Sequence, residues 1–140
     1  MRTLAALLIL TSVSCASVQR GGPEATVAEF LAAFNALELE HVGSLLTDDA
    51  TAFLPMPEAR AKITGRAAIL AALTPLFDRQ RAVGPLHLAA KGLTLQPLGP
   101  DAAVATFDVG TAEVSSRRTL VLVRRGGGWR IAHLHASNLR

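Results

Sequence analysis

The apolar residues in the first half of the chain recur at helical spacing. Between residues 24 and 39 they fall three or four positions apart, which places them on one face of a helix. Thr26 lies near the start of this segment and Glu29 follows three residues later, an arrangement typical of a capping box. The pattern therefore predicts an amphipathic helix over residues 24–39, capped by Thr26.

Further short elements are expected before residue 80. The apolar positions predict a second helix over residues 39–46 and a third over residues 66–79, inside which Pro75 should kink or break the last turn. The segments between these helices are expected to form a turn over residues 47–49, a strand over residues 50–54 and a short edge segment over residues 63–65.

The pattern changes to a period of two after Pro85. Alternating and β-branched segments separated by short turns predict strands, and short links between consecutive strands favour antiparallel pairing. Helices followed by an antiparallel meander indicate an α+β fold, with the helices packed on one face of the sheet. The four strands are expected over residues 86–97, 102–114, 116–125 and 129–139.

The last two of these strands meet at Gly126-Gly127-Gly128. Glycine permits the positive φ angles of a tight reversal, so this segment predicts a hairpin. Strand side chains alternate between the two faces of a sheet. Strict alternation places Trp129, Ile131, His133 and His135 on one face. If Ile131 packs inward, both histidines line the concave side of the sheet, with His133 the deeper of the two.

The beginning of the chain has the features of an export signal. A basic start is followed by an apolar run and small residues up to Cys15, the only cysteine. The Ser-Val-Ser-Cys ending resembles a bacterial lipobox, which predicts cleavage before a lipid-modified Cys15. The alternatives are simple secretion with loss of Cys15 and a cytoplasmic protein. We expect a signal peptide over residues 1–14, a linker over residues 15–23 and one domain over residues 24–140, either periplasmic or an outer-membrane lipoprotein, or otherwise secreted.

Composition narrows the classes of protein. A hydrophobic content of 50% excludes disorder, and 140 residues suit a single domain. After Cys15 the chain has no thiol for a disulfide, a thiolate metal site or a nucleophile. It also has no P-loop, dinucleotide-binding glycine pattern or zinc motif, so we expect no cofactor.

His133 and His135 are the main candidates for chemistry. A neutral imidazole can act as an acid, a base or a metal ligand. In a cavity the two side chains would bind a ligand or serve as a general base. Alternatively, one is a core histidine and the other lies in an oligomer interface. A metal site is disfavoured because no third ligand lies nearby in the sequence.

Asp108 interrupts an otherwise apolar strand. Inside a cavity, its carboxyl group would have a raised pKa and could act as a base. The favoured alternative is an outward-facing or edge-facing Asp108 that pairs with an arginine of the next strand.

Charge is distributed unevenly along the chain. Residues 15–59 contain one basic and seven acidic residues, whereas residues 60–140 contain twelve basic and four acidic ones. The bases near the final hairpin could attract an anionic ligand, or could be solvated charges that keep sheet edges from aggregating. Nucleic-acid binding is disfavoured because these bases are not interleaved with aromatic residues. They are Arg117, Arg118, Arg124, Arg125 and Arg130.

The order of these elements resembles a known superfamily. With the segment Ile-Thr-Gly-Arg-Ala-Ala-Ile before the third helix and the ending Trp-Arg-Ile-Ala-His-Leu-His-Ala-Ser, it is similar to the nuclear transport factor 2-like superfamily, in its SnoaL-like branch. The resemblance covers residues 24–139. It implies a cone-shaped, strongly curved antiparallel sheet with three N-terminal helices on its concave face, and a dimer formed through the convex face.

The last strands also resemble the association domain of calcium/calmodulin-dependent kinase II. That domain carries an arginine in its pocket, on the strand before the final hairpin. Leu120 stands at the matching position of this chain, and Arg118 lies two residues away on the same face.

Two classes of function remain. The first is an exported, non-catalytic module that binds an anionic or apolar small molecule or serves in assembly. The second is an enzyme of the isomerase, cyclase or dehydratase type, with His133, His135 or Asp108 as general base. The resemblance implies a carboxylate base with a Tyr oxyanion donor in the steroid-isomerase members, and the absence of Tyr from this chain favours binding. The expected ligand-binding residues are His133, His135, Arg118, Trp129 and Phe34.

A second copy of the chain is also an expected partner. Residues 103–107 and 120–123 are apolar on both faces of their strands, and the face without helices would otherwise be exposed. A membrane is expected only through a lipid on Cys15.

Overall fold

The computed structural model describes residues 21–57, 59–110 and 115–139. The predicted signal peptide, Cys15 and most of the predicted linker lie outside these ranges. The elements are α1 (Pro23–Asn35), α2 (Leu39–Ser44), β1 (Leu46–Phe53), β2 (Ile63–Thr64), α3 (Arg66–Val83), β3 (Lys91–Pro97), β4 (Ala102–Gly110), β5 (Ser115–Arg125) and β6 (Gly128–Asn138). Within the described part of the chain, no helix is both long and apolar enough to cross a membrane.

Helix α1 begins earlier and ends earlier than the sequence pattern predicts. Pro23 lies in its first turn and Gly22 is the N-cap, without a side-chain cap. Proline suits this position because its missing N–H would lack a partner there in any case. Thr26 is buried one turn inside the helix, so the predicted capping box is wrong. After the helix, Leu37 takes a φ of +57°, a left-handed conformation that stops helix propagation.

Helix α3 is longer than predicted. It continues through Pro75 to Val83 and does not end near residue 79. Pro75 cannot donate to the carbonyl group of Ala71, one turn earlier. Both residues are exposed, so water can hydrate the carbonyl group that lacks its partner.

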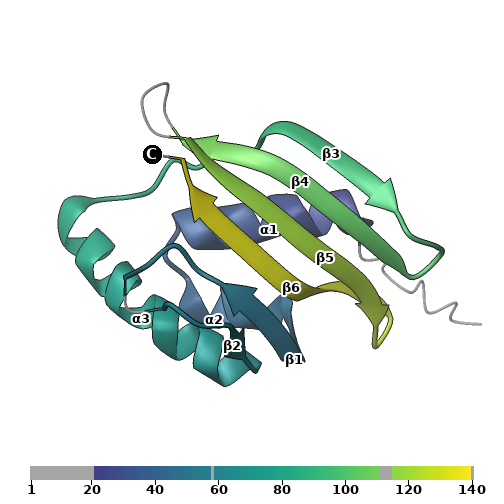
Figure 1. Ribbon diagram of the computed structural model, residues 1–140, viewed down its shortest axis with the longest axis horizontal. Coiled ribbons are helices and arrows are strands. Elements are labelled where there is room, and N and C mark those ends of the chain that lie inside the picture. Colours follow the sequence, from purple (N-terminus) through teal and green to yellow (C-terminus); the bar gives the residue numbers. More distant parts are fainter. Residues whose placement is uncertain (1–20, 58, 111–114, 140) are drawn as a thin grey trace, which may run out of the picture.

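The six strands form one sheet in the order β2-β1-β6-β5-β4-β3 (Figure 1). Strands β3 to β6 are consecutive antiparallel neighbours, which confirms the predicted meander. Strand β1 runs parallel to β6, so one pair departs from the expected antiparallel arrangement. The chain between these two strands, which includes α3 and four other strands of the sheet, provides the long connection that parallel pairing requires.

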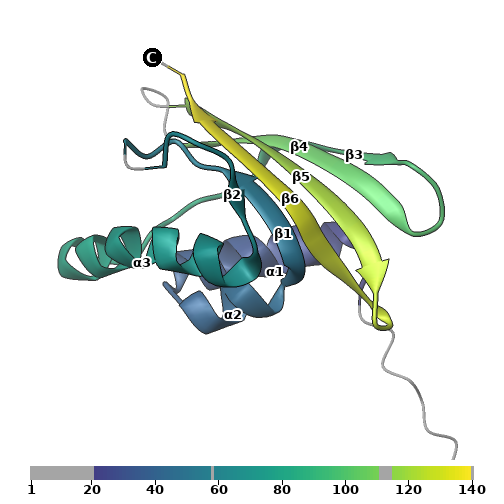
Figure 2. The same ribbon diagram turned by 60° about the horizontal axis from the view of Figure 1, so that its bottom comes forward.

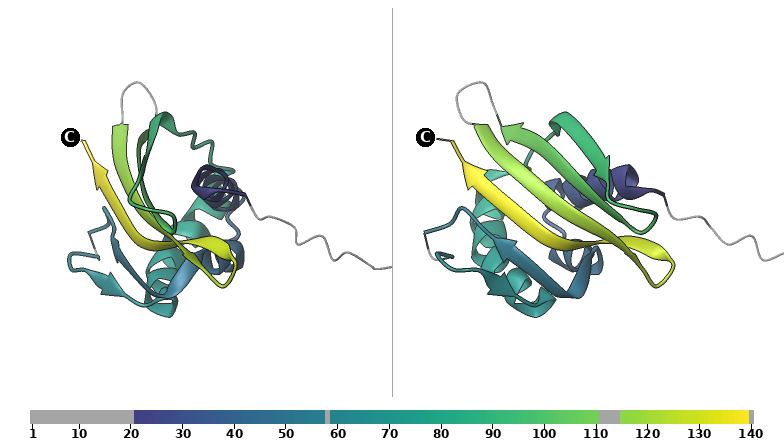
Figure 3. Two further views of the ribbon diagram at one scale, coloured as in Figure 1. Left: turned by 90° about the vertical axis from the view of Figure 1, so that its right-hand side faces the viewer. Right: turned by 45° about the vertical axis from the view of Figure 1, so that its right-hand side comes forward.

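The sheet is curved and unclosed, and the helices cover its concave face (Figures 2 and 3). This arrangement confirms the α+β fold with its N-terminal helices. The buried core between the two layers is mainly aliphatic, with Phe30, Phe77 and Phe107 among its larger side chains. The opposite face, which we call the outer face, carries no helix among the described residues.

Strand β3 begins at Lys91, so the predicted strand over residues 86–90 is wrong. The reason is a contact with α1. The side-chain amide of Asn35 donates to the carbonyl oxygen of Leu88 at 2.9 Å and accepts from its backbone N–H at 2.8 Å. Both backbone groups of Leu88 are thereby paired with a side chain instead of a neighbouring strand.

Strand β1 begins at Leu46, although residues 47–49 were expected to form a turn. The pairing of β1 with β6 is irregular in this region. Leu46 lies opposite Ile131, and the next pair is Thr51 opposite His133. The residues of the expected turn are thus an irregular part of the strand.

A β-bulge in β6 changes the alternation of its side chains. The consecutive β5 residues Val121 and Leu122 lie opposite His133 and Ile131, which leaves Ala132 without a partner. The buried side chains of β6 are Trp129 and Ile131 before the bulge and Leu134 and Ala136 after it, so their numbering changes from odd to even. Strict alternation along β6 is therefore wrong beyond Ile131.

Candidate functional site

A cavity of about 270 Å³ lies between the concave face of the sheet and the helices. Its walls come from α1, α3, the segment that Asn35 holds, and strands β4, β5 and β6. Most of the lining is apolar, including Phe30, Leu73, Leu86 and Phe107. Side chains from both ends of the chain therefore meet in one concave, apolar site, the usual form of a small-molecule pocket.

Arg118 is the only ionisable residue among the described residues that line this cavity. Its strand neighbours are Phe107 on β4 and Ala136 on β6, both buried. Its Nη1 donates to the carbonyl oxygen of Arg117 at 2.9 Å, and none of the ion pairs between described residues involves it. Burial lowers the pKa of the guanidinium, which nevertheless stays charged at neutral pH. The cavity thus holds a half-buried cation.

Phe34 also lines the cavity, from the α1 side. Its ring meets Phe77 of α3 edge-on, with ring centroids 4.8 Å apart and an interplanar angle of 84°. This geometry is favourable for an aromatic pair and fixes the ring against the helix layer. The structure therefore places two of the five expected ligand-binding residues, Arg118 and Phe34, at the cavity.

The expectation that His133 and His135 line the concave cavity is wrong. The bulge at Ala132 turns both side chains to the outer face. There Nδ1 of His133 lies 2.7 Å from Oγ1 of Thr51. The ring centroid of Phe53 lies 5.9 Å from that of His133 and 5.7 Å from that of His135. Burial, and then the nearby His135 and Lys62, lower the pKa of His133. We call Thr51, Phe53, His133 and His135 the outer histidine cluster.

Asp108 also points away from the cavity. It is exposed between the buried Phe107 and Val109, and its cross-strand neighbours are Lys91 and Arg117. This is the outward orientation that the sequence analysis favoured. The structure therefore places none of the three candidate general bases in the concave cavity.

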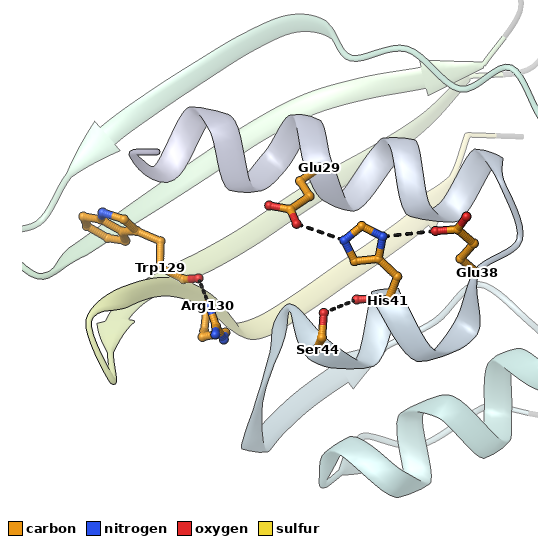
Figure 4. A network of polar contacts seen from close by, with 6 residues as sticks. All are labelled: Glu29, Glu38, His41, Ser44, Trp129 and Arg130. Atoms are coloured by element: carbon orange, nitrogen blue, oxygen red, sulfur yellow. Dashed lines mark hydrogen bonds and ion pairs between the residues drawn. The ribbon is translucent and has the colours of Figure 1, made fainter. Parts of the chain in front are cut away.

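Trp129 is buried, but it lines a different hollow. That hollow, near the start of α1, is also lined by Glu29, Ser44 and Arg130 (Figure 4). The guanidinium of Arg124 lies 5.5 Å from the centroid of the Trp129 ring, within cation–π range. The expectation that Trp129 belongs with Arg118 and Phe34 in one pocket is wrong.

A polar network that sequence reasoning missed lies between α1 and α2 (Figure 4). His41 Nε2 lies 2.9 Å from Glu29 of α1, and its Nδ1 lies 3.1 Å from Glu38 at the start of α2. The hydrogen bonds with Glu29 and then Glu38 raise the pKa of His41. The i,i+3 spacing of Glu38 and His41 was visible in the sequence, whereas the contact with Glu29 required the helix packing.

Among the described residues, no group of three or more His, Cys, Asp or Glu side chains is arranged to hold a metal ion. In the network around His41 the two ring nitrogens face different carboxylates, so the three side chains do not converge on one point.

Comparison with known proteins decides the family. The family model of the SnoaL-like domain matches residues 24–140. The chain belongs to the SnoaL-like domain family. A comparison with curated proteins found no match.

Solved structures with this fold agree with the assignment. A Thiobacillus denitrificans protein, named as a candidate calcium/calmodulin-dependent protein kinase type II association domain, has a TM-score of 0.72 and 28% identity, over 86% of this chain and 98% of that one. An NTF2-like protein of unknown function from Pseudomonas putida has a TM-score of 0.70 and 21% identity, over 81% and 82%.

A third structure, named as a candidate dehydratase of the NTF2-like family from Streptomyces avermitilis, has a TM-score of 0.67 and 16% identity, over 81% of this chain and 91% of that one. These structures show that the domain has an NTF2-like fold, and the family match confirms the predicted resemblance to the SnoaL-like branch. Their differing names show that the fold alone does not define one activity.

Proposed function

We propose that this SnoaL-like domain is a non-catalytic binding module for an apolar small molecule that carries an anionic group. The observation that carries the proposal is Arg118, a half-buried cation within an otherwise apolar cavity. A charge removed from water is destabilised unless an opposite charge or hydrogen-bond acceptors replace the lost hydration. A carboxylate at Arg118 would supply both, through two parallel N–H···O hydrogen bonds.

The rest of the cavity supports the apolar part of the ligand. Phe34, Leu73 and Phe107 line its walls, and a ligand that covers them removes apolar surface from water. Each Å² buried in this way contributes about 25 cal/mol, so an aliphatic or aromatic body supplies most of the affinity. Arg118 then fixes the orientation and selects the charge.

Binding is better supported than catalysis. The three candidate bases, Asp108, His133 and His135, lie away from the cavity, and Arg118 is a poor general base because its guanidinium remains protonated. General acid–base catalysis needs a titratable group within hydrogen-bonding reach of the substrate. The described lining of the cavity offers Arg118 as its single charged group, which suits recognition of an anion.

The proposal is tested by substituting glutamine, one at a time, for two neighbouring arginines. Arg118→Gln keeps a polar side chain, shortens it and removes the charge from the cavity. We expect it to weaken the binding of decanoate, measured by isothermal titration calorimetry, by roughly tenfold or more. Arg117→Gln is the matched control, because Arg117 is exposed on the outer face of the same strand. Equal affinities of the two variants would contradict the proposal.

We also propose that the domain is exported and, in its lipidated form, held at a membrane by Cys15. The support is the sequence of the first 15 residues alone. Intact-mass spectrometry of the protein from its native host should show loss of residues 1–14 and a diacyl-modified Cys15. Loss of a longer segment that includes Cys15 would support simple secretion, and an intact Met1 would exclude both forms of export.

A further inference from the structure

Beside the apolar cavity, the sheet has a gap in its pairing between the ends of two strands. The pairing of β1 with β6 ends where Phe53 lies opposite His135. Strand β6 runs on to Asn138, whereas β1 ends at Phe53 and the chain reaches Pro55, whose ring nitrogen cannot donate to a neighbouring strand (Figure 1). The last residues of β6 therefore extend past the end of β1.

A second hollow lies on the other side of this gap. It is an open groove of about 690 Å³, which we call the rim groove. Pro55, Met56, Ala136 and Asn138 line both the rim groove and the apolar cavity. The two hollows are therefore adjacent and meet at these four residues.

Cationic or protonatable side chains line both of these adjoining hollows. Arg118 lines the inner cavity but not the rim groove, whereas Arg60 and His135 line the rim groove but not the cavity. Arg60 and His135 are both exposed, and Arg60 Nε donates to the carbonyl oxygen of Pro57 at 3.1 Å. The shared lining between the two ends includes the apolar side chains of Pro55, Met56 and Ala136.

We infer that the ligand is an elongated apolar molecule with an anionic group at each end, and this inference rests on the proposed function. The inner group binds Arg118, the apolar body passes the gap beside Met56, and the outer group reaches Arg60 and His135. Methionine suits such a passage because its unbranched side chain adapts its shape to what it contacts. The chemical class is an α,ω-dicarboxylate or a molecule with the same spacing of charges.

The test compares ligands of equal length with one or two charged ends. Octanoate, decanoate and dodecanoate are titrated into the domain by calorimetry beside the α,ω-dicarboxylates of the same chain lengths. We expect the dicarboxylate of the best length to bind roughly tenfold more tightly than its monocarboxylate partner, because it gains a second charge-assisted contact. This comparison uses the unaltered protein and does not depend on any variant.

Substitutions then locate the second end. Arg60→Gln with His135→Gln should remove the preference for dicarboxylates and leave monocarboxylate affinity within about twofold, since a lost surface contact does not change the inner cavity. Arg79→Gln is the matched control, because Arg79 is an exposed arginine of α3 that lines neither the cavity nor the rim groove. A preference that survives in the double variant would overturn the inference.

The outcomes separate this inference from the proposed function. If both series bind equally well and Arg118→Gln weakens both, the proposed function stands and the two-ended ligand is wrong. If neither series binds, or if Arg118→Gln has no effect, the proposed function fails and the inference fails with it. Only a dicarboxylate preference that requires Arg118 at one end and Arg60 with His135 at the other supports both.

Discussion

Arg117 and Arg118 show how one step along a strand decides what a charge can do. Arg117 is exposed on the outer face beside Asp108, whereas Arg118 lies between Phe107 and Ala136 over the cavity. Water hydrates and screens the charge of Arg117, whereas the half-buried guanidinium of Arg118 is only partly hydrated. A comparison of Arg117→Gln with Arg118→Gln is therefore the most direct test of the proposed binding site.

His41 is the other residue whose surroundings set its chemistry. Its contacts with Glu29 and Glu38 join α1 to α2 and raise its pKa above the usual value of 6.5. The folded state then holds this proton more tightly than the unfolded chain. The resulting stabilisation is fully present below pH 6.5 and is lost as the pH rises through the raised pKa.

Replacing His41 should therefore cost stability only at low pH. We expect His41→Gln to reduce the free energy of unfolding by about 0.5 kcal/mol at pH 5.5, the size typical of an exposed ion pair, and to have little effect at pH 8.5. Urea denaturation at the two pH values measures this difference. His87→Gln, at an exposed position, is the control. An equal loss at both pH values would mean that His41 acts through packing and not through its charge.

At the scale of elements, the bulge in β6 decides which side chains reach the core. Leu134 is only 4% exposed, whereas His135 beside it is exposed. Strict alternation from Ile131 predicts the opposite, because it places both histidines inward. Because Ala132 is an extra residue in the pairing, each side chain after it points to the opposite face from the one that strict alternation predicts.

This assignment predicts unequal effects of two neighbouring substitutions. Leu134→Ala should lower the free energy of unfolding by about 2–5 kcal/mol, because it removes a buried side chain and leaves a cavity. His135→Ala should change it by less than about 0.5 kcal/mol, as is usual for an exposed position. Chemical denaturation of both variants gives the comparison. A larger loss for His135→Ala would restore the inward orientation that alternation predicts.

At the scale of the whole molecule, the outer face is the side of the sheet that no helix covers within the described part of the chain. Val104, Val121 and Val123 are half-buried there, and Phe53 of the outer histidine cluster is 42% exposed. We predict that this face pairs with a second copy of the chain, since a stable interface requires roughly 800 Å² from each partner and a sheet face of this kind can provide it.

A charge at the centre of the outer face should separate the copies. We expect Val121→Glu to sediment as a monomer at micromolar concentration, whereas the unaltered domain sediments as a dimer or larger. Leu98→Glu is the control, because Leu98 is 57% exposed in the β3–β4 turn and away from this face. A dimer that persists in the Val121→Glu variant would locate the interface elsewhere.

The titratable and charged groups of the outer face predict that the association of two copies depends on pH. Burial, His135 and Lys62 lower the pKa of His133. The folded protein therefore favours the neutral imidazole, and protonation of His133 is unfavourable. Protonation below pH 6.5 adds positive charge beside Lys62, on a face where Lys91 and Arg117 flank Asp108 and the exposed Asp49 of β1 is paired with Arg125. The dimer should dissociate more readily at pH 5 than at pH 7.5.

Glutamine substitution provides the check on that pH dependence. In the variant with His133→Gln and His135→Gln, the dissociation constant from sedimentation should change little between the two pH values, because glutamine does not titrate in this range. If the variant dissociates at low pH as readily as the unaltered domain, other groups are responsible.

The sequence by itself determined the features that depend on local spacing. The helical period before residue 80, the period of two after Pro85 and the glycines of the final hairpin each reflect which neighbours along the chain share a face, and the meander of β3 to β6 follows from short turns. Alternation also placed Arg118 on the same face as Leu120, which the resemblance assigned to a pocket, and an outward or edge-facing Asp108 was favoured. The family resemblance extended the same local order to the whole fold.

Only the tertiary structure decided the features that depend on distant residues. Asn35 holds Leu88 out of the sheet, β1 pairs with β6 in parallel, and Ala132 bulges where β5 and β6 pair. Alternation predicts relative faces along an unbroken ladder, so one unpaired residue was enough to move His133 and His135 from the cavity to the outer face. The physical reason is that pairing with neighbouring strands decides which face of the sheet each side chain points to. The residues of the strand alone do not specify that pairing.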